Sequence, residues 1–167
     1  ITSAQAQANL ALVGTQMVQQ VGMLHAAGAQ YILFWNYPAA SKTPGYAGNP
    51  AVGQIEALIN SVFSAVYGGL NAAGIPTIRV NSQALVNEIV ANPAAYGFAN
   101  VTSPACGAIP SLVCTSANFV TPNAASTYFF ADGVHPTTAG QLIFAQAAAS
   151  MITGPQQMAA LAEAPLA

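Results

Sequence analysis

The sequence predicts an α/β protein built around a parallel sheet. Helix-like and strand-like segments alternate over residues 1–90, and the strand-like segments are short, continuous apolar runs. A strand without alternation of apolar and polar residues is typical of a parallel sheet, in which both faces are buried by helices. Right-handed crossovers are expected between such strands. With 167 residues, the chain is long enough for one domain with a hydrophobic core.

Residues 3–27 are predicted to form the first helix. Its apolar residues recur at intervals of three and four, with Gln on the other faces, and Gly28 is a candidate C-cap. The expected apolar face consists of Leu10, Val13, Met17, Val21 and Leu24. Residues 31–35, which end with Trp35, are the first predicted strand, and Trp35 is expected in the core.

The segment of residues 36–50 contains three prolines and two glycines, so it is predicted to be a loop. An amphipathic helix over residues 52–74 and a second short strand over residues 75–80 are predicted to follow. Ser82 is a candidate N-cap for a shorter helix that ends at Val90.

Regular periodicity disappears over residues 92–125, where Pro, Gly, Ser, Thr and Asn dominate. Irregular segments of this length are uncommon unless they are functional or cross-linked. Cys106 and Cys114 lie eight positions apart in this segment, which favours one disulfide that closes a small loop; two free buried thiols are the alternative. A zinc site is disfavoured, because neither His25 nor His135 stands at a suitable spacing from the cysteines. His25 is expected to be exposed at the end of the first helix.

The chain carries very few charges. Only 4% of its residues are charged and its net charge is -2, whereas 54% are hydrophobic. This composition excludes intrinsic disorder and argues against binding to nucleic acid or anionic lipid, which requires clusters of Lys and Arg. No apolar run reaches the length of a transmembrane helix, about 18 to 20 residues. The low charge and the cysteine pair favour a location outside the cytosol.

The candidate chemistry lies at Asp132 and His135, just before a predicted last helix with Pro136 in its first turn. Across a turn, this three-residue spacing lets a carboxylate reach the imidazole Nδ1, which leaves Nε2 free to take a proton from a nucleophile. The alternative for Asp132 is a carboxylate that caps the helix. The alternative for His135 is a histidine at the surface, or one in the core with its hydrogen bonds made. Two such residues are too few to hold a metal ion.

Three stretches of the sequence resemble one enzyme family. The segment Asp-Gly-Val-His-Pro-Thr-Thr-Ala-Gly-Gln, which starts at Asp132, is similar to the C-terminal block of the SGNH (GDSL) hydrolases. Residues 31–45 and 92–98, and the positions of the cysteines, resemble the autotransporter esterase subgroup. The resemblance implies a three-layer α/β/α, flavodoxin-like fold, with Asp132 and His135 as the catalytic acid and base. It also implies a serine carboxylesterase or lipase that needs no cofactor and is secreted or displayed on the bacterial cell surface.

The serine block and both oxyanion-hole blocks of the family do not occur in this sequence. Residues 1–153 are therefore expected to be the C-terminal half of such a domain, and residues 154–167 a tail or linker. Two strands that are apolar on both faces also need something to cover them. We expect an N-terminal fragment of the same precursor to pair with this chain and to supply the catalytic serine.

The substrate is expected to be an ester or a lipid, and its contacts are less clearly indicated. Tyr37, Pro38 and Tyr46 follow the first strand and either line an acyl groove or pack as ordinary loop residues. Weak alternative nucleophiles are Ser103, Ser116 and Ser126. A non-catalytic secreted passenger that uses the same fold for binding or adhesion is the alternative function.

Overall fold

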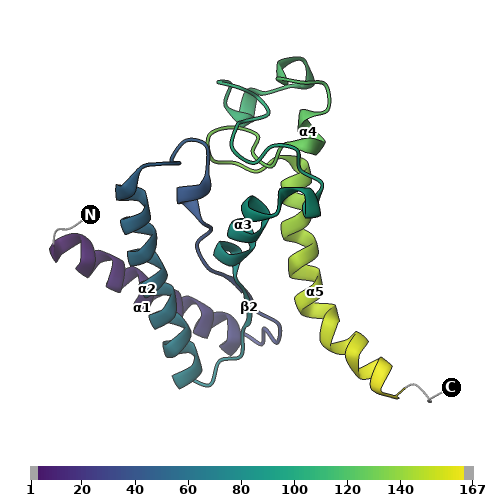
Figure 1. Ribbon diagram of the computed structural model, residues 1–167. Coiled ribbons are helices and arrows are strands. Elements are labelled where there is room, and N and C mark those ends of the chain that lie inside the picture. The colour runs from purple at the N-terminus through teal and green to yellow at the C-terminus, as the bar shows by residue number, and fades with distance from the viewer. Residues whose placement is uncertain (1–3, 164–167) are drawn as a thin grey trace.

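The computed structural model describes residues 4–163, and this part of the chain folds into helices around a two-stranded parallel sheet (Figure 1). The α/β class predicted from the sequence is confirmed at this level. The elements in chain order are α1 (Ala4–Ala26), β1 (Leu33–Trp35), α2 (Pro50–Ala72), β2 (Ile78–Val80), α3 (Ser82–Ala91), α4 (Ala124–Thr127) and α5 (Thr138–Glu163). In the described part, no helix is both long and apolar enough to cross a membrane.

Strand β1 contacts helices on both of its sides. Successive side chains of a strand point in opposite directions, so neighbouring residues of β1 reach different helices. The ring of Phe34 contacts Phe63 and Tyr67 of α2, with centroid distances of 5.9 and 5.7 Å. The next residue, Trp35, contacts Phe144 of α5 at 5.9 Å and is half-buried rather than fully in the core. Each side of the strand pair therefore packs against a different part of the helical framework.

Two clusters of buried apolar residues hold the fold together. The first joins α1 and α2 to the start of β1 and consists of Val21, Ile32, Val66 and Leu70. The second joins α3 to the irregular segment and α5, and consists of Ala39, Val86, Ile89, Phe98, Val101, Phe129 and Phe130. Phe129 and Phe130 lie almost directly before Asp132, so the packing of the second cluster positions the segment that carries the candidate site.

Both strands are shorter and more exposed than the sequence predicts. The run over residues 31–35 contracts to Leu33–Trp35, all three of which are half-buried, and Tyr31 is 79% exposed. The second strand starts at Ile78 rather than at residue 75. Because β1 and β2 have only each other as neighbours in the described sheet, parts of both strands stay open to solvent within this chain.

Helix α1 packs on α2 through Val21 of its predicted apolar face and through close approaches at glycine residues. A Cβ atom on Gly14 would lie 2.9 Å from Val62 Cγ1, and one on Gly69 would lie 3.0 Å from Val18 Cγ2. Two other members of the predicted face, Val13 and Leu24, are exposed. The helix ends as predicted, with Gly28 at a φ of 97° and His25 exposed in the last turn.

The loop after β1 is fixed to α2 by a buried carboxylate. Glu56 accepts a hydrogen bond of 2.9 Å from the Ser41 N–H and one of 2.7 Å from Gln83 Nε2. Burial acts to raise the pKa of Glu56, but these hydrogen bonds and nearby Lys42 outweigh it and lower the pKa. The carboxylate therefore holds the loop as an anion.

Two expected positions at helix starts are corrected. Asn81, not Ser82, caps α3: its side chain accepts a hydrogen bond from the Ala84 N–H, while the Ser82 hydroxyl donates to the carbonyl of Asn36. Asn81 and Ser82 are both good capping residues, so composition alone does not separate them.

Pro136 lies outside α5, which begins at Thr138, and forms an isolated antiparallel bridge with Phe130. The close approach of Gly140 to Pro136 and Phe129 places the start of α5 against that bridge. Helix α5 continues through Glu163, so the predicted tail begins as helix, and residues 164–167 lie outside the described part.

Candidate active site

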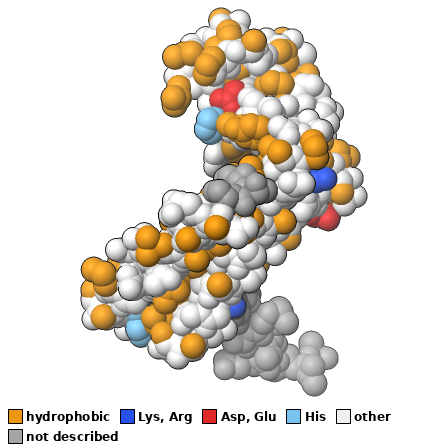
Figure 2. All heavy atoms as spheres, turned by 90° about the vertical axis from the view of Figure 1, so that its left-hand side faces the viewer, with side chains coloured by type: hydrophobic (Ala, Val, Ile, Leu, Met, Phe, Trp, Pro, Cys, Tyr) orange, Lys and Arg blue, Asp and Glu red, His pale blue; other side chains and the backbone are white. Residues whose placement is uncertain are grey.

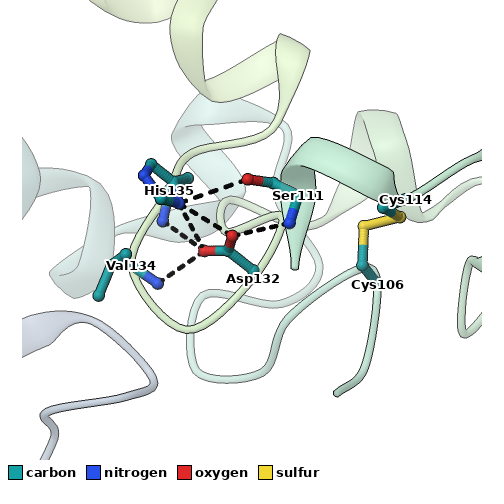
Figure 3. Close-up of polar contacts among 6 residues, drawn as sticks. All are labelled: Cys106, Ser111, Cys114, Asp132, Val134 and His135. Carbon is teal, nitrogen blue, oxygen red and sulfur yellow. Dashed lines mark hydrogen bonds and ion pairs between the residues drawn. A yellow bond between two sulfur atoms is a disulfide. The ribbon is translucent and has the colours of Figure 1, made fainter. Parts of the chain in front are cut away.

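Asp132 and His135 form a compact pair within a single turn (Figure 3). Oδ1 of Asp132 accepts hydrogen bonds from the backbone N–H groups of Val134, at 2.9 Å, and His135, at 2.8 Å. The imidazole Nδ1 lies 3.0 Å from Oδ1 and 2.9 Å from Oδ2. The structure thus brings the two residues together as their spacing predicts, with the carboxylate on the Nδ1 side of the ring.

Ser111 is a third member of this group that sequence reasoning missed. Its backbone N–H donates a hydrogen bond of 2.9 Å to Oδ2 of Asp132, and its Oγ lies 3.4 Å from Nδ1 of His135. Ser111 stands 21 positions before Asp132, so no local pattern links the two. Its place between the two cysteines is the one signal in the sequence that could have pointed to it.

A disulfide closes the loop that carries Ser111. Cys106 and Cys114 are bonded, with Cα atoms 6.1 Å apart, which confirms the predicted pairing and removes the alternative of free thiols. The N–H of Cys106 donates to the Ala131 carbonyl at 2.9 Å, and the N–H of Ala105 donates to the Phe130 carbonyl at 2.8 Å. The start of the disulfide loop is therefore fastened to the residues directly before Asp132.

The two members of the pair differ in exposure. The side chain of Asp132 is 13% exposed, whereas that of His135 is 61% exposed. Figure 2 shows a histidine beside an acidic side chain at the surface of the upper part of the molecule, with hydrophobic side chains near both. Leu112, Val113 and Val134, which neighbour Ser111 and His135 in the chain, are exposed apolar residues of this region. The imidazole is thus accessible to a reacting group while the carboxylate behind it is shielded.

The carboxylate of Asp132 is held as an anion. Burial acts to raise its pKa, but hydrogen bonds from the N–H groups of Val134 and His135, and from Ser111, outweigh burial and keep the pKa well below its usual range. An ionised Asp132 fixes the proton of a neutral imidazole on Nδ1 and stabilises the imidazolium that forms when Nε2 takes a proton.

The loop after β1 reaches the pair through its backbone. The N–H of Gly45 donates a hydrogen bond of 2.7 Å to the carbonyl of Gly133. A hollow of about 540 Å³ lies beside this contact and is lined by Pro44, Gly45, Ser103 and Asp132, among others. A larger hollow of about 620 Å³ lies between α1 and α2, away from the pair.

The lining of the site-side hollow does not include Tyr37, Pro38 or Tyr46, so the loop borders it through other residues than those singled out in the sequence.

The weak alternative nucleophiles have other surroundings. Ser103 borders the hollow, the Ser126 hydroxyl donates to the Asn123 carbonyl, and Ser116 begins a short 3-10 helix. Within residues 4–163 there is no group of three or more His, Cys, Asp or Glu side chains that could hold a metal ion.

Comparisons with known proteins point to ester hydrolases. An esterase of Pseudomonas aeruginosa, EstA, is 31% identical over 140 residues, which cover 81% of this chain and 22% of the esterase. A GDSL esterase/lipase of Arabidopsis thaliana is 42% identical over 67 residues, which cover 38% of this chain and 19% of that protein. An uncharacterized Pseudomonas putida protein from a trpE-trpG intergenic region is 29% identical over 163 residues, which cover 93% of this chain. No protein-family model matches the chain.

The names of these relatives support the SGNH/GDSL hydrolase family and, at the level of the family, hydrolysis of esters. The chain spans only 27% and 22% of the length of the two Pseudomonas relatives described above.

Proposed function

We propose that this chain supplies the acid–base half of a serine ester hydrolase with the three-layer SGNH fold, in which Asp132 and His135 are the catalytic pair. The observation that carries the proposal is the geometry of this pair. The carboxylate is ionised, shielded and bonded to Nδ1, and the imidazole is exposed. This is the arrangement that a general base needs when a nucleophile approaches Nε2.

The reaction would proceed through an acyl-enzyme. A serine hydroxyl attacks the ester carbonyl and gives its proton to Nε2 of His135, and the tetrahedral intermediate then expels the alcohol, which takes that proton. Water attacks the acyl-enzyme in the same way, with His135 again as base and then as acid. Asp132 keeps the ring oriented and stabilises the imidazolium. The oxyanion is stabilised by backbone and side-chain N–H groups outside this chain.

Ser111 does not fit the role of this nucleophile. Its Oγ lies on the Nδ1 side of the ring, where Asp132 already accepts the Nδ1 proton, and the separation of 3.4 Å is long for a hydrogen bond. We therefore propose that the serine lies on an N-terminal part of the same precursor, which pairs with this chain as the C-terminal half of the domain. The short, half-buried sheet and the exposed apolar side chains of α1 support a covering partner.

The placement outside the cytosol belongs to the same proposal. The disulfide is typical of oxidising compartments, which supports a secreted or cell-surface protein. We propose more specifically that the protein is a passenger of an outer-membrane autotransporter and that residues 154–167 are the linker toward the membrane part of that protein.

Serine labelling combined with an ester assay tests the function. The protein purified with its N-terminal part is expected to hydrolyse a short-chain p-nitrophenyl ester, and a serine-directed phosphonate should modify only the N-terminal part. His135→Ala should abolish turnover and leave the circular dichroism spectrum unchanged. Retained turnover in His135→Ala, or a phosphonate adduct on this chain, would overturn the proposal. If the parent protein with its N-terminal part is folded but does not hydrolyse the ester, the result would instead favour the non-catalytic binding passenger.

Size measurement tests the pairing. Gel filtration with mass spectrometry should find this chain together with a second polypeptide. A folded monomer of this chain alone would contradict the proposed half-domain.

A further inference from the structure

We infer that Ser111 is a positioning residue for the acid–base pair, acting through its backbone N–H on Asp132, and that the Cys106–Cys114 disulfide holds it in place. This inference rests on the proposed function and adds a residue to its site. The contact that carries it is the 2.9 Å hydrogen bond from the Ser111 N–H to Oδ2.

The need for this contact follows from the freedom of an aspartate side chain. Oδ1 is fixed by the turn that contains the pair, through the N–H groups of Val134 and His135. The χ2 torsion of Asp is broad, so hydrogen bonds at Oδ1 alone leave the carboxylate free to rock about its Cβ–Cγ bond within the tolerance of those bonds. Apart from the imidazole itself, Ser111 supplies the hydrogen bond that fixes Oδ2. A hydrogen bond at each oxygen narrows this rocking and so steadies the plane of the carboxylate and the direction of the ring.

Ser111 in turn depends on the disulfide. The residues that follow it, Leu112 and Val113, are 94% and 67% exposed, so their side chains do not anchor the loop by packing. The loop is held instead by the bond between Cys106 and Cys114 and by backbone hydrogen bonds such as that from the Val113 N–H to the Pro110 carbonyl. The disulfide therefore anchors this loop in place of a buried side chain.

A proline substitution isolates the backbone donor. Ser111→Pro removes the N–H, and the backbone accommodates the ring because Ser111 is the first residue of a 3-10 helix and Pro110 before it is extended, with a ψ of 141°. Ser111→Ala removes only the hydroxyl. Ser116→Pro is the matched control, because Ser116 also begins a 3-10 helix after an extended residue, Thr115, and is exposed.

The experiment compares the steady-state kinetics of the three variants and of His135→Ala in the protein with its N-terminal part. Ser111→Pro is expected to lower kcat about 10-fold with KM little changed and with the melting temperature lowered by only about 5 °C, as for the loss of one charge-assisted hydrogen bond. Ser111→Ala should lose less than about 3-fold, and Ser116→Pro should match the parent protein.

An unchanged kcat in Ser111→Pro, with His135→Ala inactive, would overturn the inference and leave the proposed function standing. Complete loss in Ser111→Ala would also overturn it, since the hydroxyl would then be the reacting group. Full activity of His135→Ala would remove the proposed function itself.

Discussion

Gly45 and Gly133 touch through their backbones, with the N–H of Gly45 donating a 2.7 Å hydrogen bond to the Gly133 carbonyl. Gly45 belongs to the loop after β1, and Gly133 lies between Asp132 and His135. The loop that leaves the sheet is thereby bonded to the turn that carries the acid–base pair. Since α2 fixes the same loop through Glu56, the position of the turn depends on elements that are far away in the sequence.

Gly45→Ala is expected to disturb this contact. A Cβ atom at residue 45 would lie 2.9 Å from the Gly133 carbonyl oxygen, so the backbone of one loop must move. We expect a loss of about 1 to 3 kcal/mol in the free energy of unfolding, as for overpacked sites, and lower kcat. Chemical denaturation and ester hydrolysis measure both effects.

Gly53→Ala is the matched control for this substitution, because nothing lies within 4 Å of a Cβ atom at that helical position. It should stabilise the protein by about 0.5 to 1 kcal/mol. Equal stability of the two variants would contradict the steric argument at Gly45.

Stability should depend on the charge of Asp132 at low pH. The carboxyl has a pKa below its reference value of 3.8 in the folded chain, so the folded state binds the proton less tightly than the unfolded state. The resulting stabilisation is fully present above about pH 5 and is lost as the pH falls below about 4. The difference in unfolding free energy between the parent protein and Asp132→Asn should shrink over that range. A difference that stays constant from pH 6 to pH 3 would contradict the assignment.

Loss of the disulfide should weaken both the fold and the site. Replacing Cys106 and Cys114 together by Ser is expected to lower the free energy of unfolding by about 2 to 3 kcal/mol, because the loop gains freedom in the unfolded chain. Activity should fall as well, since the loop carries Ser111. Denaturation curves measure the loss in the free energy of unfolding, and kcat at a temperature where both proteins are folded measures the loss in activity. Unchanged kcat in the folded double variant would show that the loop keeps its position without the bond.

Glu56→Ala should destabilise the loop after β1. The substitution leaves the Ser41 N–H and the Gln83 side chain without their acceptor, and the expected loss is about 1 to 3 kcal/mol. Gln54→Ala, an exposed change on the same helix, should stay within about 0.5 kcal/mol of the parent protein. Thermal melting of the two variants compares them directly, and similar melting temperatures would contradict a supporting role for Glu56.

Local features of this chain could be predicted from its sequence. Helix α2 runs from Pro50 to Ala72, close to the range expected from its apolar periodicity. The contact between Asp132 and His135 could be foreseen because it spans one turn and needs only a fixed spacing. The disulfide followed from the nearness of Cys106 and Cys114 in a segment without other structure.

Features that depend on contacts between distant segments could not be predicted in this way. Ser111 and Gly45 reach the pair through backbone groups, which leave no mark on residue type. The packing of α1 was foreseen only in part, because periodicity weighs side-chain hydrophobicity, whereas Gly14 of α1 and Gly69 of α2 permit close approach by having no side chain. The lengths of the strands were overestimated for a different reason: an apolar run indicates a strand but not how far it pairs, and each strand has only one neighbour in the described sheet.

The backbone origin of the Asp132 hydrogen bonds has a consequence for how the sequence around the pair can diverge. Every residue except proline supplies an N–H group, so positions 111 and 134 can change identity without removing a donor from the carboxylate. Gly133 should also accept other residues, because a Cβ atom there lies at ordinary van der Waals distance from Gly45. A Cβ atom at Gly45, by contrast, would lie too close to the Gly133 carbonyl oxygen. Mutational tolerance around the turn is therefore uneven, and saturation mutagenesis should find proline excluded at Val134 while many other side chains are accepted there.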